Sequence, residues 1–101
     1  MLYQLFFLLS PVFKYTIFGH SMSPTLHPGQ IIFVNRLSYL FKKPKVNDIV
    51  AAKIDKKVFI KRITKIEGSM IYLRGDNSND SIDSKIFGFV SREQLIGKVL
   101  Y

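Results

Sequence analysis

The sequence has no cysteine, few acidic residues and no apolar run of about 20 residues, the length that a membrane-spanning helix needs. Without cysteine there is no disulfide framework, no zinc ribbon and no thiol nucleophile. Seven Asp and Glu residues stand against 15 Lys and Arg residues, which gives a formal net charge of +8 at pH 7. This balance is typical of proteins that contact nucleic acid or an anionic membrane, but it also favours solubility, and composition does not separate the three. At 101 residues the chain has room for one small domain.

The first segment is apolar but short. Leu2 to Phe13 is a twelve-residue run interrupted by Gln4, Ser10 and Pro11. It has neither the basic start nor the small-residue cleavage site of a secretory signal peptide. We expect residues 1–14 to form a short apolar helix, either an anchor on a membrane or the first docked element of a soluble core. Residues 15–101 are expected to form one folded domain.

Beyond residue 14 the pattern predicts an all-β fold, a small folded or barrel-like sheet. Runs rich in β-branched and aromatic residues alternate with turn signals. The predicted strands are residues 15–18, 30–35, 48–54, 57–66, 70–73 and 96–101. Residues 36–41 fit either a short helix or a loop, residues 75–84 are a polar loop, and residues 91–94 fit one helical turn.

One segment has the features of a catalytic turn. Residues 19–29 follow a predicted strand and contain glycine and two prolines, which force an irregular surface turn. Ser21 lies on that turn, where a hydroxyl is well placed to act as a nucleophile if a base removes its proton. His20 is a poor base because adjacent side chains in extended chain point to opposite faces. We interpret His20 and His27 as polar loop residues, and we expect no metal site.

Lysine is the alternative base. Its ordinary pKa of about 10.4 leaves roughly one molecule in a thousand neutral near pH 7, so a lysine base needs an apolar setting. Strand alternation places Lys61 on the same face as Phe59 and Ile63, which are both large and apolar. Composition alone does not select Lys61, because most of the eleven lysines must be solvated.

Three ordered blocks strengthen this choice. Residues 21–26 read SMSPTL, residues 60–63 read IKRI, and residues 75–88 read GDNSNDSIDSKIFG. They resemble the nucleophile, base and third conserved blocks of the type I signal peptidase family, membrane-associated serine proteases with a Ser–Lys dyad. Residues 47–50 and 96–99 are weaker echoes of the same family. The resemblance covers nearly all of the chain from residue 15 onward.

The resemblance implies roles for individual residues. Ser21 would attack the scissile carbonyl, Lys61 would accept its proton, and the Ser21 backbone N–H would meet the oxyanion. Ser81 would orient Lys61. Asp83 would pair with Lys85, where the family usually has an arginine that makes a two-pronged contact.

The third block also supplies supporting residues, Asp76 and Asn77. Gly19 stands where some family members carry a serine that donates a second oxyanion hydrogen bond. For the substrate, the resemblance implies an extended preprotein leader peptide. We expect it to contact the residues around the dyad, namely Phe18, Gly19, Met22 and Phe59.

The expected partners follow from the same reading. We expect the basic surface to contact an anionic membrane, with Lys42, Lys43 and Lys45 beside Leu40 and Phe41 as a candidate contact loop. No cofactor and no nucleic acid are expected. The protein would be membrane-associated with its catalytic domain on the trans side.

Two alternatives stay open. One is a dedicated maturation protease for a single client, such as nickel superoxide dismutase, which would place the protein in the cytoplasm. The other is a non-catalytic basic β-domain that binds nucleic acid or anionic lipid. The net charge and the aromatic content favour this second alternative, while the absence of a stacking motif disfavours it.

Overall fold

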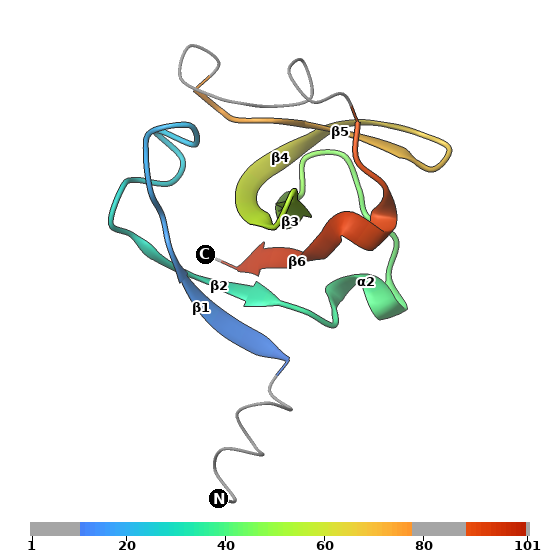
Figure 1. Ribbon diagram of the computed structural model, residues 1–101, viewed down its shortest axis with the longest axis horizontal. Helices are drawn as coiled ribbons and strands as arrows, with labels where there is room; N and C mark the ends of the chain where they lie inside the picture. Colours follow the sequence, from blue (N-terminus) through green and yellow to red (C-terminus); the bar gives the residue numbers. More distant parts are fainter. Residues whose placement is uncertain (1–10, 78–88, 101) are drawn as a thin grey trace, which may run out of the picture.

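The protein is an all-β fold, as the sequence predicts (Figure 1). The computed structural model describes residues 11–77 and 89–100. Six antiparallel strands form one sheet in the order β1-β2-β6-β3-β4-β5. The strands are β1 (Val12–Thr16), β2 (Ile31–Asn35), β3 (Ile49–Ile54), β4 (Lys57–Glu67), β5 (Met70–Arg74) and β6 (Leu95–Leu100). A one-turn helix α2 (Ser38–Phe41) and a 3-10 turn η1 (Arg92–Gln94) complete the described elements.

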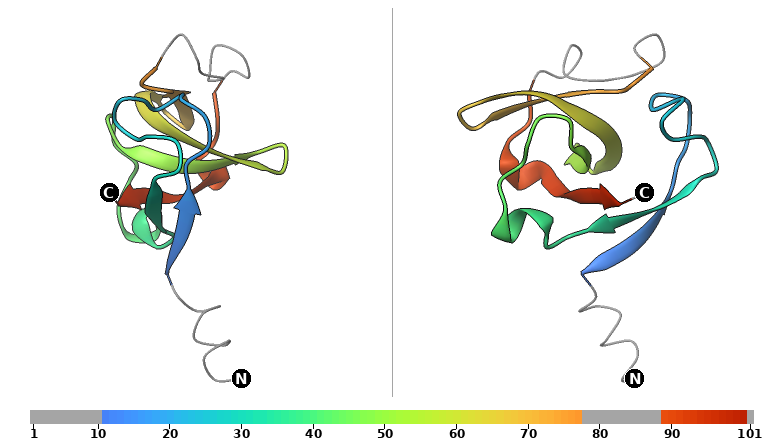
Figure 2. Two further views of the ribbon diagram at one scale, coloured as in Figure 1. Left: turned by 90° about the vertical axis from the view of Figure 1, so that its left-hand side faces the viewer. Right: turned by 180° about the vertical axis from the view of Figure 1, so that it is seen from behind.

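The sheet bends around itself, and both of its faces are partly covered (Figures 1 and 2). In β3, alternate side chains enter two different apolar clusters. Ile49 and Ala51 pack in one cluster, and Val50 and Ala52 pack in the other. This explains why β3 reads as a continuous apolar run rather than as an alternating one. β3 is therefore buried on both faces of the sheet.

The start of the sheet differs from the prediction. Val12 opens β1, so residues 12–14 pair with β2, although the apolar Val12 and Phe13 suggested that they belong to the preceding segment. Pairing from Val12 with Asn35 to Thr16 with Ile31 fixes this boundary, and no local signal in the sequence reports that pairing. The predicted N-terminal helix falls mainly on residues 1–10, which lie outside the described residues. The ambiguous segment 36–41 ends in a helix, α2.

The other boundaries agree with the prediction to within two residues. Within residues 11–77 and 89–100, no helix combines the length and the apolar character that crossing a membrane requires.

Candidate active site

The turn between β1 and β2 holds Ser21 on a closed loop. The Ile17 N–H donates to the Gln30 carbonyl at 2.9 Å, and the Gly29 N–H donates to the Ile17 carbonyl at 2.8 Å. Gly19 adopts φ +74°, in the left-handed region that favours glycine. These constraints fix the path of the turn and leave the Ser21 side chain half-buried.

Two apolar side chains anchor the same turn in the core. Met22 is 1% exposed and Leu26 is fully buried, and both pack with Ile60 of β4. The turn that carries Ser21 is therefore attached to the strand that carries Lys61. Because Met22 lies in the core, the structure places it behind the turn rather than on an open peptide-binding surface.

Lys61 is removed from solvent. It lies in the middle of β4 and is only 3% exposed. In the part of the chain that the structure describes, no other charged side chain is classed as buried. Its strand partner is Val50, and the partner of Phe59 is Ala52, so both pair with core positions of β3. The alternation that suggested an apolar setting for Lys61 thus coincides with the observed burial.

Arg62 links the base block to the other two blocks. Its Nε and Nη2 atoms each donate to the Asp76 carboxylate at 2.8 Å, a two-pronged contact. The Thr25 hydroxyl donates to the same carboxylate from the nucleophile turn. A third guanidinium nitrogen, Nη1, donates to the Asn47 carbonyl at 2.9 Å. One arginine therefore joins segments from four places in the sequence.

The electrostatics of Asp76 follow from this contact. The Arg62 guanidinium holds the pKa of the Asp76 carboxyl below its usual range, and the Thr25 hydroxyl acts in the same direction. Partial burial acts against both but does not outweigh them. Asp76 is therefore a fixed anion between two segments of the site.

Asn77 fastens the third block to the nucleophile turn. Its backbone N–H donates to the Ser21 carbonyl at 2.8 Å, and its side-chain amide donates to the His20 carbonyl at 3.2 Å. Both carbonyls belong to residues beside or at the candidate nucleophile. Asn77 can thus fix the backbone of Ser21 without contacting its hydroxyl.

The remaining predicted residues fall in two groups. Phe18 is 79% exposed next to the turn, and Phe59 is half-buried. Ser81, Asp83 and Lys85 lie outside the described residues.

The sequence analysis did not assign roles to Arg62 and Thr25, although both lie inside the quoted blocks. The signal available for Arg62 was its position as an arginine directly after the candidate base Lys61.

The histidines agree with their reading as loop residues. His20 and His27 are both exposed. Among the described residues, no three His, Asp or Glu side chains gather into a group able to hold a metal ion.

Comparison with known proteins identifies relatives of this chain. Residues 1–74 and 64–101 match the family described as signal peptidase, peptidase S26. The chain is 31% identical to the mitochondrial ATP-independent inner membrane protease subunit 1b of Arabidopsis thaliana, covering 83% of this chain and 65% of that protein. It is 28% identical to signal peptidase I of Bacillus caldolyticus, over 85% of this chain and 76% of that protein. It is 27% identical to the thylakoidal processing peptidase 1 of Arabidopsis thaliana, over 80% of this chain and 38% of that protein. The chain therefore spans less than two thirds of some of these relatives.

Proposed function

Because this chain belongs to the signal peptidase family, peptidase S26, we propose that it is a serine endopeptidase that removes N-terminal leader peptides from preproteins. Ser21 is the nucleophile and Lys61 is the general base. The observation that carries this proposal is the burial of Lys61, which is 3% exposed on β4. The next residue of that strand, Arg62, donates to Asp76, and Asp76 also accepts a hydrogen bond from Thr25 of the nucleophile turn. Burial disfavours the charged form of an amine, and the neutral amine is the form that accepts a proton.

The reaction follows from these assignments. The Ser21 oxygen forms a bond to the scissile carbonyl carbon while its proton passes to the neutral Lys61 amine. The Ser21 backbone N–H stabilises the oxyanion. When the tetrahedral intermediate collapses, the C–N bond breaks and Lys61 gives the proton to the leaving amine. Lys61 then takes a proton from a water molecule as its oxygen attacks the acyl carbon. When the bond between that carbon and the Ser21 oxygen breaks, Lys61 returns the proton to Ser21, which releases the acid product and leaves Lys61 neutral again.

Five further residues support the Ser–Lys dyad in this proposal. Asp76 and Asn77 hold the nucleophile turn by the hydrogen bonds described above. The roles of Ser81, in orienting Lys61, and of Asp83 with Lys85, in holding the third block, are carried over from the family resemblance.

The substrate is a leader peptide in extended form. In the described sheet β1 is a terminal strand, and it runs directly to Gly19 and the exposed Phe18. A peptide that adds to this edge would gain main-chain hydrogen bonds and meet Phe18 near Ser21. Met22 supports this surface from the core, and the role of Phe59 as a substrate contact is carried over from the family resemblance.

We place the protein at a membrane, with its catalytic domain on the trans side. The relatives support membrane association, since one is named as an inner membrane protease and another as a thylakoidal processing peptidase. The trans side is carried over from the family resemblance.

Leader-peptide cleavage tests the proposal directly. A panel of synthetic leader peptides is incubated with the full chain, and the cut position is read by mass. Ser21→Ala and Lys61→Met each abolish cleavage, while Ser23→Ala in the same turn and Lys57→Met on the same strand retain it. Circular dichroism checks that all four variants fold. Cleavage that persists in both Ser21→Ala and Lys61→Met would overturn the dyad.

The panel also separates the alternatives. Cleavage of one client leader alone would assign the narrower role of a dedicated maturation protease. A folded wild-type protein that cuts no leader, and binds nucleic acid with a steep salt dependence, would be a binding domain instead.

A further inference from the structure

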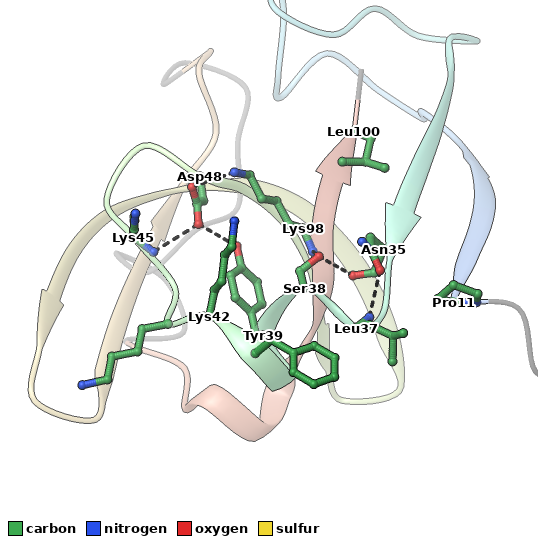
Figure 3. Close-up of a pocket in the computed structure, with 12 residues that line it drawn as sticks. Pro11, Asn35, Leu37, Ser38, Tyr39, Lys42, Lys45, Asp48, Lys98 and Leu100 are labelled. Atoms are coloured by element: carbon green, nitrogen blue, oxygen red, sulfur yellow. Dashed lines mark hydrogen bonds and ion pairs between the residues drawn. The ribbon is translucent and has the colours of Figure 1, made fainter.

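A basic pocket lies away from the candidate active site. Its volume is about 500 Å³, and it lies between α2, the loop that follows α2, and strands β2 and β6 (Figure 3). Four lysines line it: Lys42, Lys43, Lys45 and Lys98. Asp48 is the one acidic side chain among the described residues that line the pocket.

Asp48 is already committed to protein groups. It accepts hydrogen bonds from the Tyr39 hydroxyl at 2.8 Å and from the Lys45 backbone N–H at 3.1 Å, and Lys98 lies 3.5 Å away. Burial, together with this carboxylate, raises the pKa of Tyr39, so its hydroxyl remains a donor. Asp48 can offset at most one lysine. The pocket therefore carries a net positive charge suited to an anion.

Large apolar side chains project beside these lysines. Phe41 is 83% exposed and Leu40 is 70% exposed, both on the helix that borders the pocket. Leu37 and Leu100 line the pocket and are each about two fifths exposed. Aromatic and aliphatic side chains next to lysine are the composition of a surface that lies in a membrane interface.

The apolar first segment of the chain joins the fold at the same place. Pro11, the first described residue, lines the pocket, and the ten residues before it are mostly apolar. The pocket, the α2 tip and the entry of this segment are thus continuous. A bilayer is the one partner that suits all three at once.

We propose that the α2 surface, defined as Leu40, Phe41, Lys42, Lys43 and Lys45 with the pocket behind them, docks on an anionic phospholipid bilayer. Phe41 and Leu40 enter the interface, and the lysines bind lipid phosphates. Lys98 and Asn35 also line the pocket, in which a headgroup is held. This inference deepens the membrane association in the proposed function and rests on it, but it does not depend on the Ser–Lys chemistry.

A nucleic acid is a weaker candidate for this surface. Its phosphates would bind the lysines, but two exposed aliphatic or aromatic side chains at the tip would gain little from a duplex backbone. Displacement from vesicles by duplex DNA would therefore contradict docking on lipid.

Two charge-matched variants of the full chain test the α2 surface. The first changes Lys42, Lys43 and Lys45 to Gln. The second changes Lys53, Lys56 and Lys57 to Gln, three exposed lysines in and beside the β3–β4 hairpin. Both lose the same charge, but only the first alters the proposed surface. Binding is measured by sedimentation with vesicles of equal parts phosphatidylglycerol and phosphatidylcholine, and with vesicles of phosphatidylcholine alone.

The expected results differ between the two variants. Each lysine near an anionic surface strengthens binding about fivefold, so the first variant should bind the mixed vesicles on the order of a hundredfold more weakly. The second should bind within a few-fold of wild type. Binding to phosphatidylcholine alone should not change in either variant. Equal losses in both variants, or no loss in the first, would overturn the α2 surface.

A fluorescent reporter tests the insertion of α2. The sequence has no tryptophan, so Phe41→Trp gives the protein a single tryptophan whose fluorescence can be excited selectively. Its emission should shift to the blue on mixed vesicles, and brominated lipid should quench it. The control is Phe89→Trp, because Phe89 is half exposed and its ring lies tilted, 5.9 Å away, against the ring of Tyr72 on β5, a strand across the molecule from α2 (Figure 1). An unshifted Trp at position 41, or equal shifts at both positions, contradicts insertion through α2.

Competition and cleavage separate the remaining outcomes. If inorganic phosphate or duplex DNA displaces the protein from vesicles at low concentration, the site is a general anion site and the lipid assignment fails. Cleavage of soluble leader peptides is measured in parallel and should be the same in both triple variants. If cleavage is absent but the vesicle results hold, the proposed enzymatic function fails while the docking surface stands.

Discussion

The Arg62 guanidinium donates to both oxygens of the Asp76 carboxylate at 2.8 Å, and Arg62 is the residue that follows the buried Lys61 in β4. Asp76 also accepts a hydrogen bond from the hydroxyl of Thr25, which lies 51 positions away in the sequence. Three blocks that are far apart along the chain therefore meet at one carboxylate. This contact is placed to set the relative positions of the nucleophile turn and the base strand.

Replacing Arg62 by Lys should lower cleavage more than it lowers stability. Lysine keeps the charge but cannot make the two-pronged contact with Asp76 or reach Asn47 at the same time. We expect kcat to fall about tenfold or more, the loss expected when a catalytic geometry is loosened, with KM little changed. Steady-state cleavage of a leader peptide measures both constants.

Arg36→Lys is the matched control for this variant. Arg36 is exposed and stacks on Phe13 at 4.7 Å, so the same substitution there should leave kcat unchanged. Wild-type kcat in Arg62→Lys would show that the two-pronged contact does not position the site.

Asp76→Asn should make the protein less stable at neutral pH and less sensitive to acid. Arg62 lowers the pKa of Asp76, so the charged carboxylate is the form that the folded state favours. Its contribution is present above the unfolded value of about 3.9 and is lost as the pH falls toward the folded value. We expect a loss of about 1–3 kcal/mol at pH 7, because a hydrogen-bonded charge has been removed.

Urea unfolding from neutral to acidic pH measures this effect. The difference in unfolding free energy between wild type and Asp76→Asn should shrink below about pH 4. The control is Asp55→Asn, an exposed carboxylate in the β3–β4 hairpin, which should change the unfolding free energy little. A constant gap for Asp76→Asn down to pH 2 would show that its charge does not stabilise the fold.

Much of the fold was predictable because its signals are local. The apolar run at β3, the alternation at β4 and the turn residues between strands are visible in the sequence. The start of β1 was not, because Val12 and Phe13 are apolar and resemble the segment before them. Their place in the sheet is decided by pairing with β2, which lies about 20 residues away.

The site divides in the same way. Ser21 and Lys61 are predictable as candidates because each lies in a short block with a chemical rationale. The contact of Arg62 with Asp76 is not predictable, because it depends on the path of β4 and of the chain after β5. Met22 illustrates the limit, since an apolar residue beside a nucleophile suits a pocket wall or the core equally well. The structure places it in the core.

Gly97→Ala should destabilise the sheet where β6 meets β2. A Cβ atom at Gly97 would lie 2.2 Å from the Asn35 carbonyl oxygen and 2.7 Å from its carbonyl carbon. Both are backbone atoms of a paired strand, so neither can move aside without breaking the pairing. Overpacking of this kind costs about 1–3 kcal/mol.

Chemical denaturation of Gly97→Ala and Gly68→Ala measures this cost. Gly68 has open space around its missing Cβ and a φ of +58°, so alanine there should cost about 1 kcal/mol or less from backbone strain alone. A Gly97→Ala protein as stable as wild type would mean that β2 and β6 are farther apart than described.

The pH dependence of cleavage should identify the base. If Lys61 is the base, kcat/KM rises tenfold per pH unit on the acidic side of its titration, because only the neutral amine accepts the Ser21 proton. A histidine base would instead reach a plateau above about pH 7.5. The exposed His20 and His27 are the only imidazoles in the chain, so His20→Gln and His27→Gln should leave the profile unchanged. A rate that is flat from about pH 6 to about pH 10, or a plateau that either histidine variant abolishes, would exclude Lys61 as the base.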